Sequence, residues 1–456
     1  MAFGTSAILV ASLVHCSDRV TEPTPAAPGV HLALDAANSG VVTAKEVRAL
    51  AAQRGIGPLE QPHPVRPALV QLGQALMFDP ILSGNHDMTC ATCHFPTFST
   101  GDARSVTIGV GGTGIGPNRI PPASGFLGRN APPLFDLGTL KHAFWDGRVE
   151  VDAQGHFHTP AGAQLTPEMA RVLEFGALSA QPLFPPAAAT EMRGASGNEL
   201  ASLPADDYTD IWAGLMRRLG NIPEYRRMFE KAYPGTKFED MNFAYASNAI
   251  AGFIVSKLTF TNAPWDRFLR GQNKALTPAQ LAGAQTFLTL KCSICHNGPT
   301  LTDDKFHDVA VAQIGPGDAN GASGHDDFGR MNATGNSADQ YLFRTTPLRN
   351  VELTAPYGHD GAYATLRGFI EHYSQSDQAL LNYDPTQLEP ALQNTVLDNK
   401  SDVLAQRDTL LNGVVLTPEI VDKLMAYMSA LTDDAARNLS GLIPASVPSG
   451  LPVPRP

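Results

Sequence analysis

The sequence predicts a mainly α-helical protein with two domains, long irregular loops and little β-structure. Three observations support this prediction. Segments with apolar residues at three- and four-residue spacing recur along the chain, whereas few segments alternate apolar and polar residues as strands do. Gly and Pro are frequent, at 41 and 36 residues, so long loops separate the helices. A chain of 456 residues is long enough for two ordinary domains, each with its own core.

The predicted helices are recognised by their apolar stripes or by their first residues. In two of them a threonine that can cap the helix precedes a proline at the first helical position, which is the preferred start of a helix. A Gly- and Pro-rich stretch after the first cysteine pair, residues 105–130, is predicted to be irregular. The expected helices cover residues 69–76, 206–219, 223–232 and 241–258, and two more begin at Thr277-Pro278 and Thr417-Pro418.

Composition excludes two classes of partner. The chain has 33 Lys and Arg against 44 Asp and Glu, a formal net charge of −11, and no long basic cluster, which argues against a nucleic-acid surface. No apolar run reaches the roughly 20 residues of a membrane-spanning helix. We therefore expect no transmembrane span in the mature protein and no nucleic-acid partner.

The first 46 residues contain three imperfect motifs. Residues 7–14 are apolar like the core of a signal peptide, but no Lys or Arg precedes them. Cys16 and the Pro/Thr-rich stretch 21–28 imitate a lipoprotein cysteine and its tether, although His15 stands where a small residue is normal, so a spare cysteine is the alternative. Residues 35–46 imitate an EF-hand calcium loop, but Ala37 occupies a required oxygen-ligand position, which favours a decayed loop or a helix start.

The cysteines indicate the cofactor. Four of the five cysteines form two C-x-x-C-H motifs, one at Cys90, Cys93 and His94 and the other at Cys292, Cys295 and His296. This spacing lets two thiols attach one haem covalently while the adjacent histidine ligates its iron. A pair of zinc or redox C-x-x-C motifs is the alternative, but both copies carry the histidine. The sequence predicts two covalently bound haem c groups and hence export from the cytoplasm, since haem is attached outside it.

The two motifs lie about 200 residues apart, which is consistent with one haem per domain. The predicted fold is therefore mainly α, with two c-type cytochrome-like haem domains. The expected divisions are a signal-like segment and linker, 1–28; an N-terminal extension, 29–64; a first haem domain, 65–245; a second haem domain, 246–434; and a proline-rich tail, 435–456.

Further motifs carry a resemblance to a known family. They are Arg129-Asn130-Ala131-Pro132, Phe144-Trp145-Asp146-Gly147-Arg148, Leu348-Arg349-Asn350, Thr354-Ala355-Pro356-Tyr357 and His359-Asp360-Gly361. Together with the haem motifs they resemble the bacterial di-haem cytochrome c peroxidase family, which includes the tryptophan-modifying enzyme MauG. The resemblance runs from about Leu72 to Leu431. It implies two haem domains around a calcium ion, and a peroxidatic haem that reacts with hydrogen peroxide.

The resemblance assigns residues above the first haem. In ordinary family peroxidases a histidine in the loop after the first motif ligates the peroxidatic iron, and Val110 stands in the matching stretch here. Val110 cannot ligate iron, so the resemblance implies a five-coordinate haem on His94. The family's catalytic glutamate corresponds to Glu191 and its glutamine to Gln181. A carboxylate and an amide above a haem can relay the peroxide proton between its two oxygens.

For the second iron the resemblance implies a tyrosine ligand. Typical family peroxidases place a methionine there, and the matching position in this chain is Tyr373. Its neighbour His372 is a competing ligand, and only one of the two can face the iron because adjacent helical residues point about 100° apart. The MauG-like branch shares both departures, the missing distal histidine and the tyrosine.

The remaining assignments concern calcium and hole transfer. Trp145 matches the tryptophan between the two haems, where it can carry an oxidising equivalent. The carried-over calcium ligands are the Asn130 side chain and the carbonyls of Thr354 and Pro356, and oxygen ligands suit this cation. Leu290 replaces the surface tryptophan that MauG uses to oxidise its protein substrate, so the resemblance does not determine the route by which an oxidising equivalent leaves this protein. Trp265 could be a surface relay, or it could be buried in the haem domain. Residues 150–178 resemble an insertion at the pocket rim.

The sequence therefore predicts a periplasmic or otherwise exported, MauG-like di-haem peroxidase. Hydrogen peroxide would react at the haem on His94, assisted by Glu191 and Gln181, and the oxidising equivalents would be shared through Trp145 with the haem on His296 and Tyr373. A partner protein or a donor would then be oxidised. The alternatives are a conventional peroxidase with a small cytochrome or cupredoxin donor, and a non-catalytic electron-transfer protein in which His359 or another histidine completes the coordination.

Overall fold

The computed structural model describes Met1, residues 42–123 and residues 125–456. The signal-like segment, Cys16, the linker and residues 35–41 of the EF-hand-like loop lie outside the described residues. Where that loop was expected to end, Thr43 caps helix α1 (Ala44–Gln53). The Thr43 hydroxyl accepts a hydrogen bond from the Glu46 backbone N–H, and the Glu46 carboxylate accepts one from the Thr43 N–H, at 3.3 and 3.0 Å. This capping box makes residues 43–46 a helix start.

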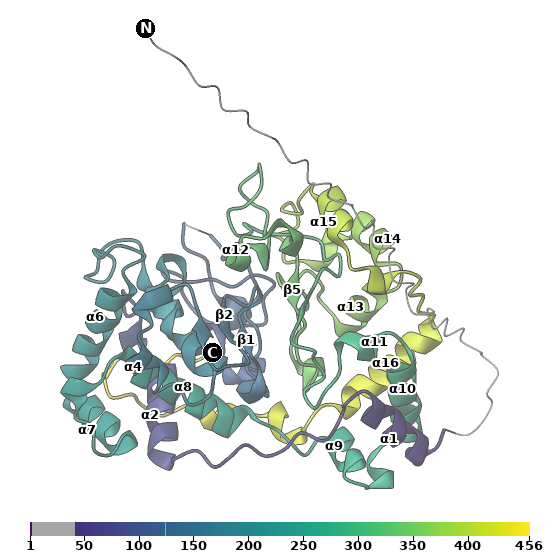
Figure 1. The fold of residues 1–456 in the computed structure, drawn as a ribbon, viewed down its shortest axis with the longest axis horizontal. Coiled ribbons are helices and arrows are strands. Elements are labelled where there is room, and N and C mark those ends of the chain that lie inside the picture. Colours follow the sequence, from purple (N-terminus) through teal and green to yellow (C-terminus); the bar gives the residue numbers. More distant parts are fainter. Residues whose placement is uncertain (2–41, 124) are drawn as a thin grey trace. The chain divides into compact units, whose positions relative to one another are not determined.

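The prediction of a mainly α-helical fold with little β-structure is confirmed (Figure 1). The helices after α1 are α2 (Pro67–Phe78), α3 (Cys90–Cys93), α4 (Pro167–Ala170), α5 (Ala177–Ala180), α6 (Tyr208–Gly220), α7 (Pro223–Ala232), α8 (Phe243–Leu258), α9 (Pro264–Leu269), α10 (Pro278–Thr289), α11 (Cys292–Cys295), α12 (Met331–Thr334), α13 (Leu366–His372), α14 (Ser376–Leu381), α15 (Lys400–Gln406) and α16 (Pro418–Ala430). Within the described ranges no helix is long and apolar enough to cross a membrane.

The strands are only two or three residues long. One antiparallel sheet has the order β1-β2-β3, and a second antiparallel pair joins β4 to β5. The strands are β1 (His142–Ala143), β2 (Val149–Val151), β3 (Phe157–His158), β4 (Phe306–His307) and β5 (Phe343–Arg344). The hairpin of β2 and β3 lies in the stretch expected to be an insertion.

The six predicted helices are all present. The four predicted from apolar spacing are α2, α6, α7 and α8, and the two predicted from a Thr-Pro start are α10 and α16. The hydroxyls of Thr277 and Thr417 accept hydrogen bonds from the backbone N–H groups of Gln280 and Ile420. Local signals were sufficient here because capping and amphipathic spacing are properties of neighbouring residues.

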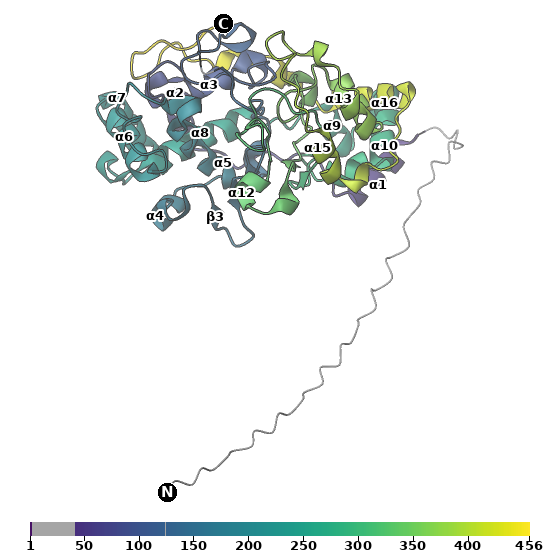
Figure 2. The same ribbon diagram turned by 90° about the horizontal axis from the view of Figure 1, so that it is seen from above.

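Buried side chains form two hydrophobic cores. The first core takes side chains from α2, α5, α6, α7 and α8, and the second from α1, α9, α10, α13 and α16 (Figures 1 and 2). The predicted division at residue 245 falls inside α8, whose buried side chains belong to the first core. A division after Leu258 keeps this helix whole.

Each core is built around a helix that precedes a C-x-x-C-H motif. Helix α2 crosses α8 at Gly73, where a Cβ atom would lie 1.9 Å from the carbonyl oxygen of Ala249. Helix α10 crosses α16 at Gly283, where a Cβ atom would lie 2.0 Å from the carbonyl oxygen of Lys423. Only glycine permits backbones to approach this closely. The two crossings set the position from which the chain enters each motif.

The proline-rich tail packs against the first core. The carbonyl of Leu442 accepts a hydrogen bond from the Gln74 side chain at 2.9 Å, and Val447 is buried in the first core. The carboxylate of Asp79 is fully buried and accepts hydrogen bonds from the hydroxyls of Tyr225 and Ser449 at 2.7 and 2.6 Å. The tail therefore returns the end of the chain to the domain that begins with α2.

We predict that Asp79→Ala lowers the free energy of unfolding by about 2–4 kcal/mol, because it leaves the buried Tyr225 hydroxyl without an acceptor and releases Ser449. Thermal and urea unfolding of the haem-loaded protein measure the loss. Asp434→Ala is the matched control, since the Asp434 side chain is 92% exposed and its loss should change the free energy by no more than about 0.5 kcal/mol. Equal effects of the two substitutions would refute a role for Asp79 in fastening the tail.

Candidate active site

The first C-x-x-C-H motif forms one helical turn. Cys90 and Cys93 bound α3, and His94 follows as its C-cap. The Nδ1 atom of His94 lies 3.0 Å from the carbonyl oxygen of Thr100. A carbonyl only accepts, so Nδ1 carries the ring proton and Nε2 keeps its lone pair for a metal. Burial lowers the pKa of His94, which also favours the neutral ring.

A cavity of about 720 Å³ opens beside this turn. Its walls come from the first motif, from apolar side chains of the first core and from polar residues of the loops after α3 and before β1. This volume and the thiol, imidazole and apolar lining fit a covalently attached haem with space beside it. Its walls include Cys90, Cys93, His94, Met77, Met88, Leu134, Ile250 and Ile254, and among the residues predicted to be functional Asn130, Trp145, Gln181 and Glu191.

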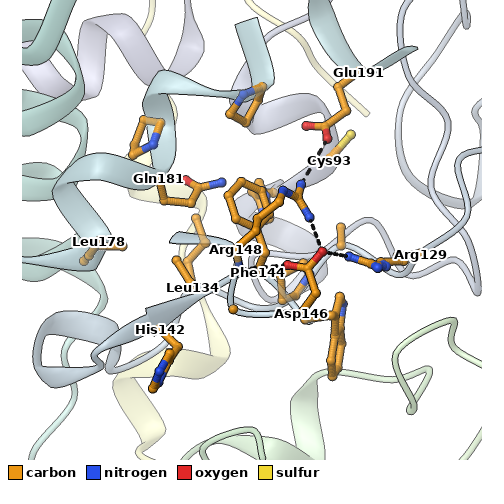
Figure 3. Close-up of a pocket in the computed structure, with 18 of the residues that line it drawn as sticks. Cys93, Arg129, Leu134, His142, Phe144, Asp146, Arg148, Leu178, Gln181 and Glu191 are labelled. Carbon is orange, nitrogen blue, oxygen red and sulfur yellow. Dashed lines mark hydrogen bonds and ion pairs between the residues drawn. The ribbon is translucent and has the colours of Figure 1, made fainter. Parts of the chain in front are cut away.

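The structure brings the two predicted distal residues together in this cavity. Glu191 lies on a π-helix (Ala189–Arg193, η8), and Gln181 follows α5. Both side chains line the cavity, and Figure 3 shows them on its wall with the guanidinium of Arg148 between them and Asp146. Burial raises the pKa of Glu191 above its ordinary value, while Arg148 lowers it. A carboxylate in this place can accept a proton from a bound substrate and return it.

The loop that holds a distal histidine in ordinary family peroxidases turns its backbone toward η8. The Val110 N–H donates a hydrogen bond to the carbonyl oxygen of Glu191 at 2.8 Å, and Val110 is not among the cavity-lining residues. The cavity also contains two histidines of the small sheet. His142 lies 3.3 Å from Asp304 and His158 lies 3.2 Å from Asp152, but Nδ1 of His142 makes no hydrogen bond within the described residues.

Sequence reasoning missed an ion-pair cluster beside the cavity. Arg129 contacts Asp146, Asp327 and Asp318 at 2.6, 2.6 and 3.2 Å, and Asp146 also pairs with Arg148 at 2.9 Å (Figure 3 shows the Asp146 pairs). Burial opposes ionisation of Asp146, yet Arg148 and Arg129 hold its pKa below the ordinary range. The charged residues Asp146 and Arg148 in the Phe144–Arg148 motif were the available signal in the sequence, but the sequence did not show which residues they pair with.

Trp145 and Asn130 are joined by a hydrogen bond. The indole N–H of Trp145 donates to the carbonyl oxygen of Asn130 at 2.9 Å, and the carbonyl oxygen of Trp145 accepts from the N–H of Arg344 on β5. The side-chain amide of Asn130 donates to the carbonyls of Arg104 and Ser105, which leaves its Oδ1 available as an acceptor. Trp145 thus connects the cavity wall to Arg344 in the second half of the chain.

The predicted calcium residues lie in adjoining segments. The N–H of Asn130 donates to the carbonyl oxygen of His359 at 2.9 Å, and Thr354 and Pro356 lie a few residues before His359. Oxygen atoms from an amide and from backbone carbonyls are the donor set that calcium prefers. The calcium site stays a prediction.

The second C-x-x-C-H motif repeats the geometry of the first. Cys292 and Cys295 bound α11, and Nδ1 of His296 lies 3.1 Å from the carbonyl oxygen of Leu301. Nε2 of His296 is again the nitrogen left for a metal. Burial lowers the pKa of His296 to about 4, so the ring is neutral.

Two neighbours at the end of α13 compete for the second iron, and hydrogen bonds distinguish them. Nε2 of His372 lies 2.7 Å from the carbonyl oxygen of Val309, and its Nδ1 lies 2.6 Å from the hydroxyl of Tyr363. Both ring nitrogens of His372 are therefore occupied. The phenol of Tyr373 lies near the sulfur atoms of Cys295 and Cys292, and burial raises its pKa, which favours the neutral phenol until a metal binds it. His372 has no free nitrogen for a metal, and Tyr373 as the ligand stays a prediction.

Next to the second motif lies a histidine held by two carboxylates. His307 lies 3.1 Å from Asp303 through Nε2 and 2.6 Å from Asp408 through Nδ1. The hydrogen bond to Asp303, the neighbouring Cys295 thiol and Asp408 raise the pKa of His307 to about 11. In the described part of the chain, Cys295, Asp303 and His307 are the one His/Cys/acidic group with the spacing of a metal site. Since Cys295 belongs to the haem motif, we interpret this group as an ion-pair cluster and not as a metal site. In it, the protonated His307 joins the loop of Asp303 to the loop of Asp408.

Trp265 is not a surface relay. Its side chain is fully buried, stacks on Phe268 with ring centres 5.4 Å apart, and meets Tyr427 edge-on at 5.0 Å. Phe287 continues this cluster from Tyr427 toward His296, with ring centres 4.9 and 6.4 Å apart. The surface alternative for Trp265 was wrong because α9 packs against the second core, which could not be inferred from a single aromatic letter.

Comparison with known proteins identifies the family. The family model described as Di-haem cytochrome c peroxidase matches residues 67–274. The chain is 28% identical over 392 residues to the cytochrome c551 peroxidase of Pseudomonas aeruginosa, covering 85% of this chain and 84% of that protein. The chain belongs to the di-haem cytochrome c peroxidase family.

Relatives of both functional kinds lie within this family. The chain is 29% identical to the methylamine utilization protein MauG of Paracoccus denitrificans, covering 83% of this chain and 92% of MauG. A crystal structure of a MauG-like protein associated with microbial copper homeostasis covers 84% of this chain and 95% of its own, with 26% identity and a TM-score of 0.57. The protein is thus a di-haem peroxidase, and its family implies two haem c groups. None of these comparisons supports a lipid anchor at Cys16, which the sequence left open beside a spare cysteine.

We predict that the double variant Cys292→Ser/Cys295→Ser retains one covalent haem instead of two. Each motif supplies the two thiols for its own haem, so the first motif should be unaffected. Haem content per chain by pyridine haemochrome absorbance, together with intact mass, measures this ratio. The reciprocal variant Cys90→Ser/Cys93→Ser is the control and should lose the other haem. Two haems per chain in either variant would contradict the assignment.

Proposed function

We propose that this protein is a MauG-like di-haem peroxidase, in which hydrogen peroxide reacts at the haem on His94 and oxidising equivalents are shared with the haem on His296 and Tyr373. The haem groups supply the redox chemistry when bound. The observation that carries the proposal is the Val110 loop, whose backbone is bonded to Glu191 and which offers no histidine to the cavity. The carboxylate of Glu191 therefore faces a cavity that no loop histidine closes.

Glu191 and Gln181 have separate roles in this proposal. The ionised Glu191 carboxylate accepts the proton of the bound peroxide and returns it to the outgoing oxygen. The amide of Gln181 donates a hydrogen bond that orients the peroxide. Apolar side chains such as Leu134, Met77 and Ile254 exclude bulk water from the cavity. This exclusion strengthens every charge interaction with the peroxide.

Tyr373 and Trp145 provide the second part of the proposal. A phenolate ligand stabilises ferric and higher oxidation states, whereas methionine raises the haem potential and favours the reduced state. Tyr373 at the second iron therefore suits storage of an oxidising equivalent. Trp145 links the cavity wall to Arg344 of β5 and is proposed as the bridge for electron transfer. The final reductant is a partner protein or a donor.

A conventional peroxidase remains the second candidate. The relative from Pseudomonas aeruginosa is named a cytochrome c551 peroxidase, which favours peroxide removal with a small cytochrome as the donor. The two candidates differ in whether the diferric protein reacts directly. A non-catalytic electron carrier requires a second ligand on both irons, and the Val110 loop offers no histidine to the cavity.

The proposal includes a calcium ion and export. Asn130, with the carbonyls of Thr354 and Pro356, would hold the ion between the two haem sites. Covalent haem attachment takes place outside the cytoplasm, so the mature protein is proposed to be periplasmic.

We predict that the diferric protein reacts with one equivalent of hydrogen peroxide without prior reduction. Rapid loss of the high-spin ferric signal and a long-lived near-infrared band are expected in stopped-flow spectra. The rate should fall as the pH drops through the pKa of Glu191, because the raised pKa leaves this proton acceptor protonated at acidic pH.

Glu191→Gln should slow this reaction by about 10²–10⁴-fold and remove its acidic limb, because glutamine cannot accept the proton. A diferric protein that stays inert until one haem is reduced would favour the conventional peroxidase. Inertness in both redox states would leave an electron carrier.

We predict that Tyr373→Met raises the reduction potential of the second haem by more than about 100 mV, since axial ligands tune haem potentials over roughly 0.8 V. Spectroelectrochemical titration measures the change. Tyr383→Phe is the matched control, because it removes a buried phenol of the same domain that donates to the carbonyl of Ala362. Equal potentials in Tyr373→Met and the parent protein would exclude Tyr373 as the ligand.

A further inference from the structure

Arg148 occupies a place in the cavity that the proposed function does not yet explain. Its guanidinium lines the cavity beside Glu191, with its Nη2 atom 3.7 Å from Oε1 of the carboxylate. The guanidinium also lies over the ring of Phe144, 3.6 Å from its centre. Figure 3 shows it extended between Asp146 and Glu191. A cation stacked on an aromatic ring and held by a carboxylate has few orientations open to it.

Asp146 fixes the guanidinium from behind. One Asp146 oxygen accepts from the backbone N–H of Arg148 at 3.0 Å, and the other pairs with its Nη1 at 2.9 Å. The same Asp146 oxygen pairs with Arg129, which in turn holds the buried Asp327. A chain of alternating charges thus runs from Asp327 through Arg129, Asp146 and Arg148 to Glu191. Each member is held by the one before it.

Two cations and two carboxylates act on the charge of Glu191. The groups that act on it are Arg148 and Asp146 from the segment after β1, Arg129 from the loop after the first motif, and Asp318 from the second half of the chain. Burial and the two aspartates favour the protonated acid, while Arg148 and then Arg129 favour the carboxylate. Arg129 already pairs with three carboxylates, so Arg148 is the cation that acts most strongly on Glu191.

We propose that Arg148 is a positioning residue of the peroxide reaction, which directs the Glu191 carboxylate into the cavity and keeps it ionised so that it can accept the peroxide proton. This inference rests on the proposed function, since it assigns Arg148 to act through Glu191. The proton passes from peroxide to the carboxylate oxygen and then to the outgoing oxygen, and Arg148 neither gains nor loses a proton. Its charge acts only on the first of these transfers.

The test measures Glu191 in the resting haem-loaded protein and then in turnover. Infrared difference spectra against pH record the carboxylic acid C=O band of Glu191, which is identified by its loss in Glu191→Gln. Arg148→Gln should raise the titration midpoint of this band by about one to three pH units, because an opposite charge at this distance has an effect of that size. Arg148→Lys should restore part of the shift, since it keeps the charge but not the fork. Arg171→Gln is the matched control, as Arg171 is exposed and pairs only with Glu168 on α4.

The stopped-flow reaction with peroxide should follow the same midpoints. Below the new midpoint, Arg148→Gln should react at least about tenfold more slowly than the parent, and the two rates should converge at higher pH. An unchanged band midpoint in Arg148→Gln overturns the inference, as does a uniform loss of rate at every pH. Arg148→Lys decides the question if Arg148→Gln does not fold. If Glu191→Gln reacts as fast as the parent, the proposed role of Glu191 fails, and the band midpoint still tests the electrostatic action of Arg148 separately.

Discussion

The site depends on the buried guanidinium of Arg129. Its three carboxylate partners come from two distant parts of the chain: Asp146 precedes the inserted hairpin, and Asp318 and Asp327 lie in the second half. Asp146 and Asp327 are buried, so removal of Arg129 would leave Asp327 without this cation and Asp146 with Arg148 alone, at a cost of about 3–5 kcal/mol. The next residue, Asn130, accepts the indole hydrogen bond of Trp145. One two-residue run therefore positions the charge chain, the proposed bridge between the haems and the proposed calcium ligand.

The orientation of each predicted haem histidine, by contrast, depends on residues close to it in the sequence, and the same arrangement occurs in both motifs. In both motifs a helical turn ends at the histidine, and the chain then curves so that a carbonyl five or six residues later meets Nδ1. That contact fixes the proton on Nδ1 and orients Nε2 as a ligand. Close helix crossings at Gly73 and Gly283 set the preceding helix in each case. The two motifs thus share one local geometry, although they pack against two different hydrophobic cores.

Features that depend on residues close together in the sequence could be predicted, and features that depend on distant residues could not. Helix positions and the haem histidines were predicted because their signals lie within a few residues. Glu191 and Gln181 required the family resemblance, since a lone carboxylate carries no signal of its cavity. The cluster around Arg129 could not be predicted, because its partners Asp146 and Asp327 lie 17 and 198 positions away. The choice between a buried and a surface Trp265 stayed open, and the docking of the tail on Asp79 was missed, for the same reason: each depends on packing between elements far apart in the chain.

His372 and Tyr373 show how distant contacts determine which of two neighbouring side chains is free to bind a metal. A sequence offers both side chains, and histidine is the commoner haem ligand. Val309, 63 positions away, holds Nε2 of His372, and Tyr363 holds Nδ1, so the imidazole serves as an anchor for the end of α13. The adjacent phenol of Tyr373 lies near the cysteines of the second haem motif. Because relatives of both kinds belong to this family, the proposed function rests on single positions such as Val110 and Tyr373 and on the contacts around them, and not on the fold.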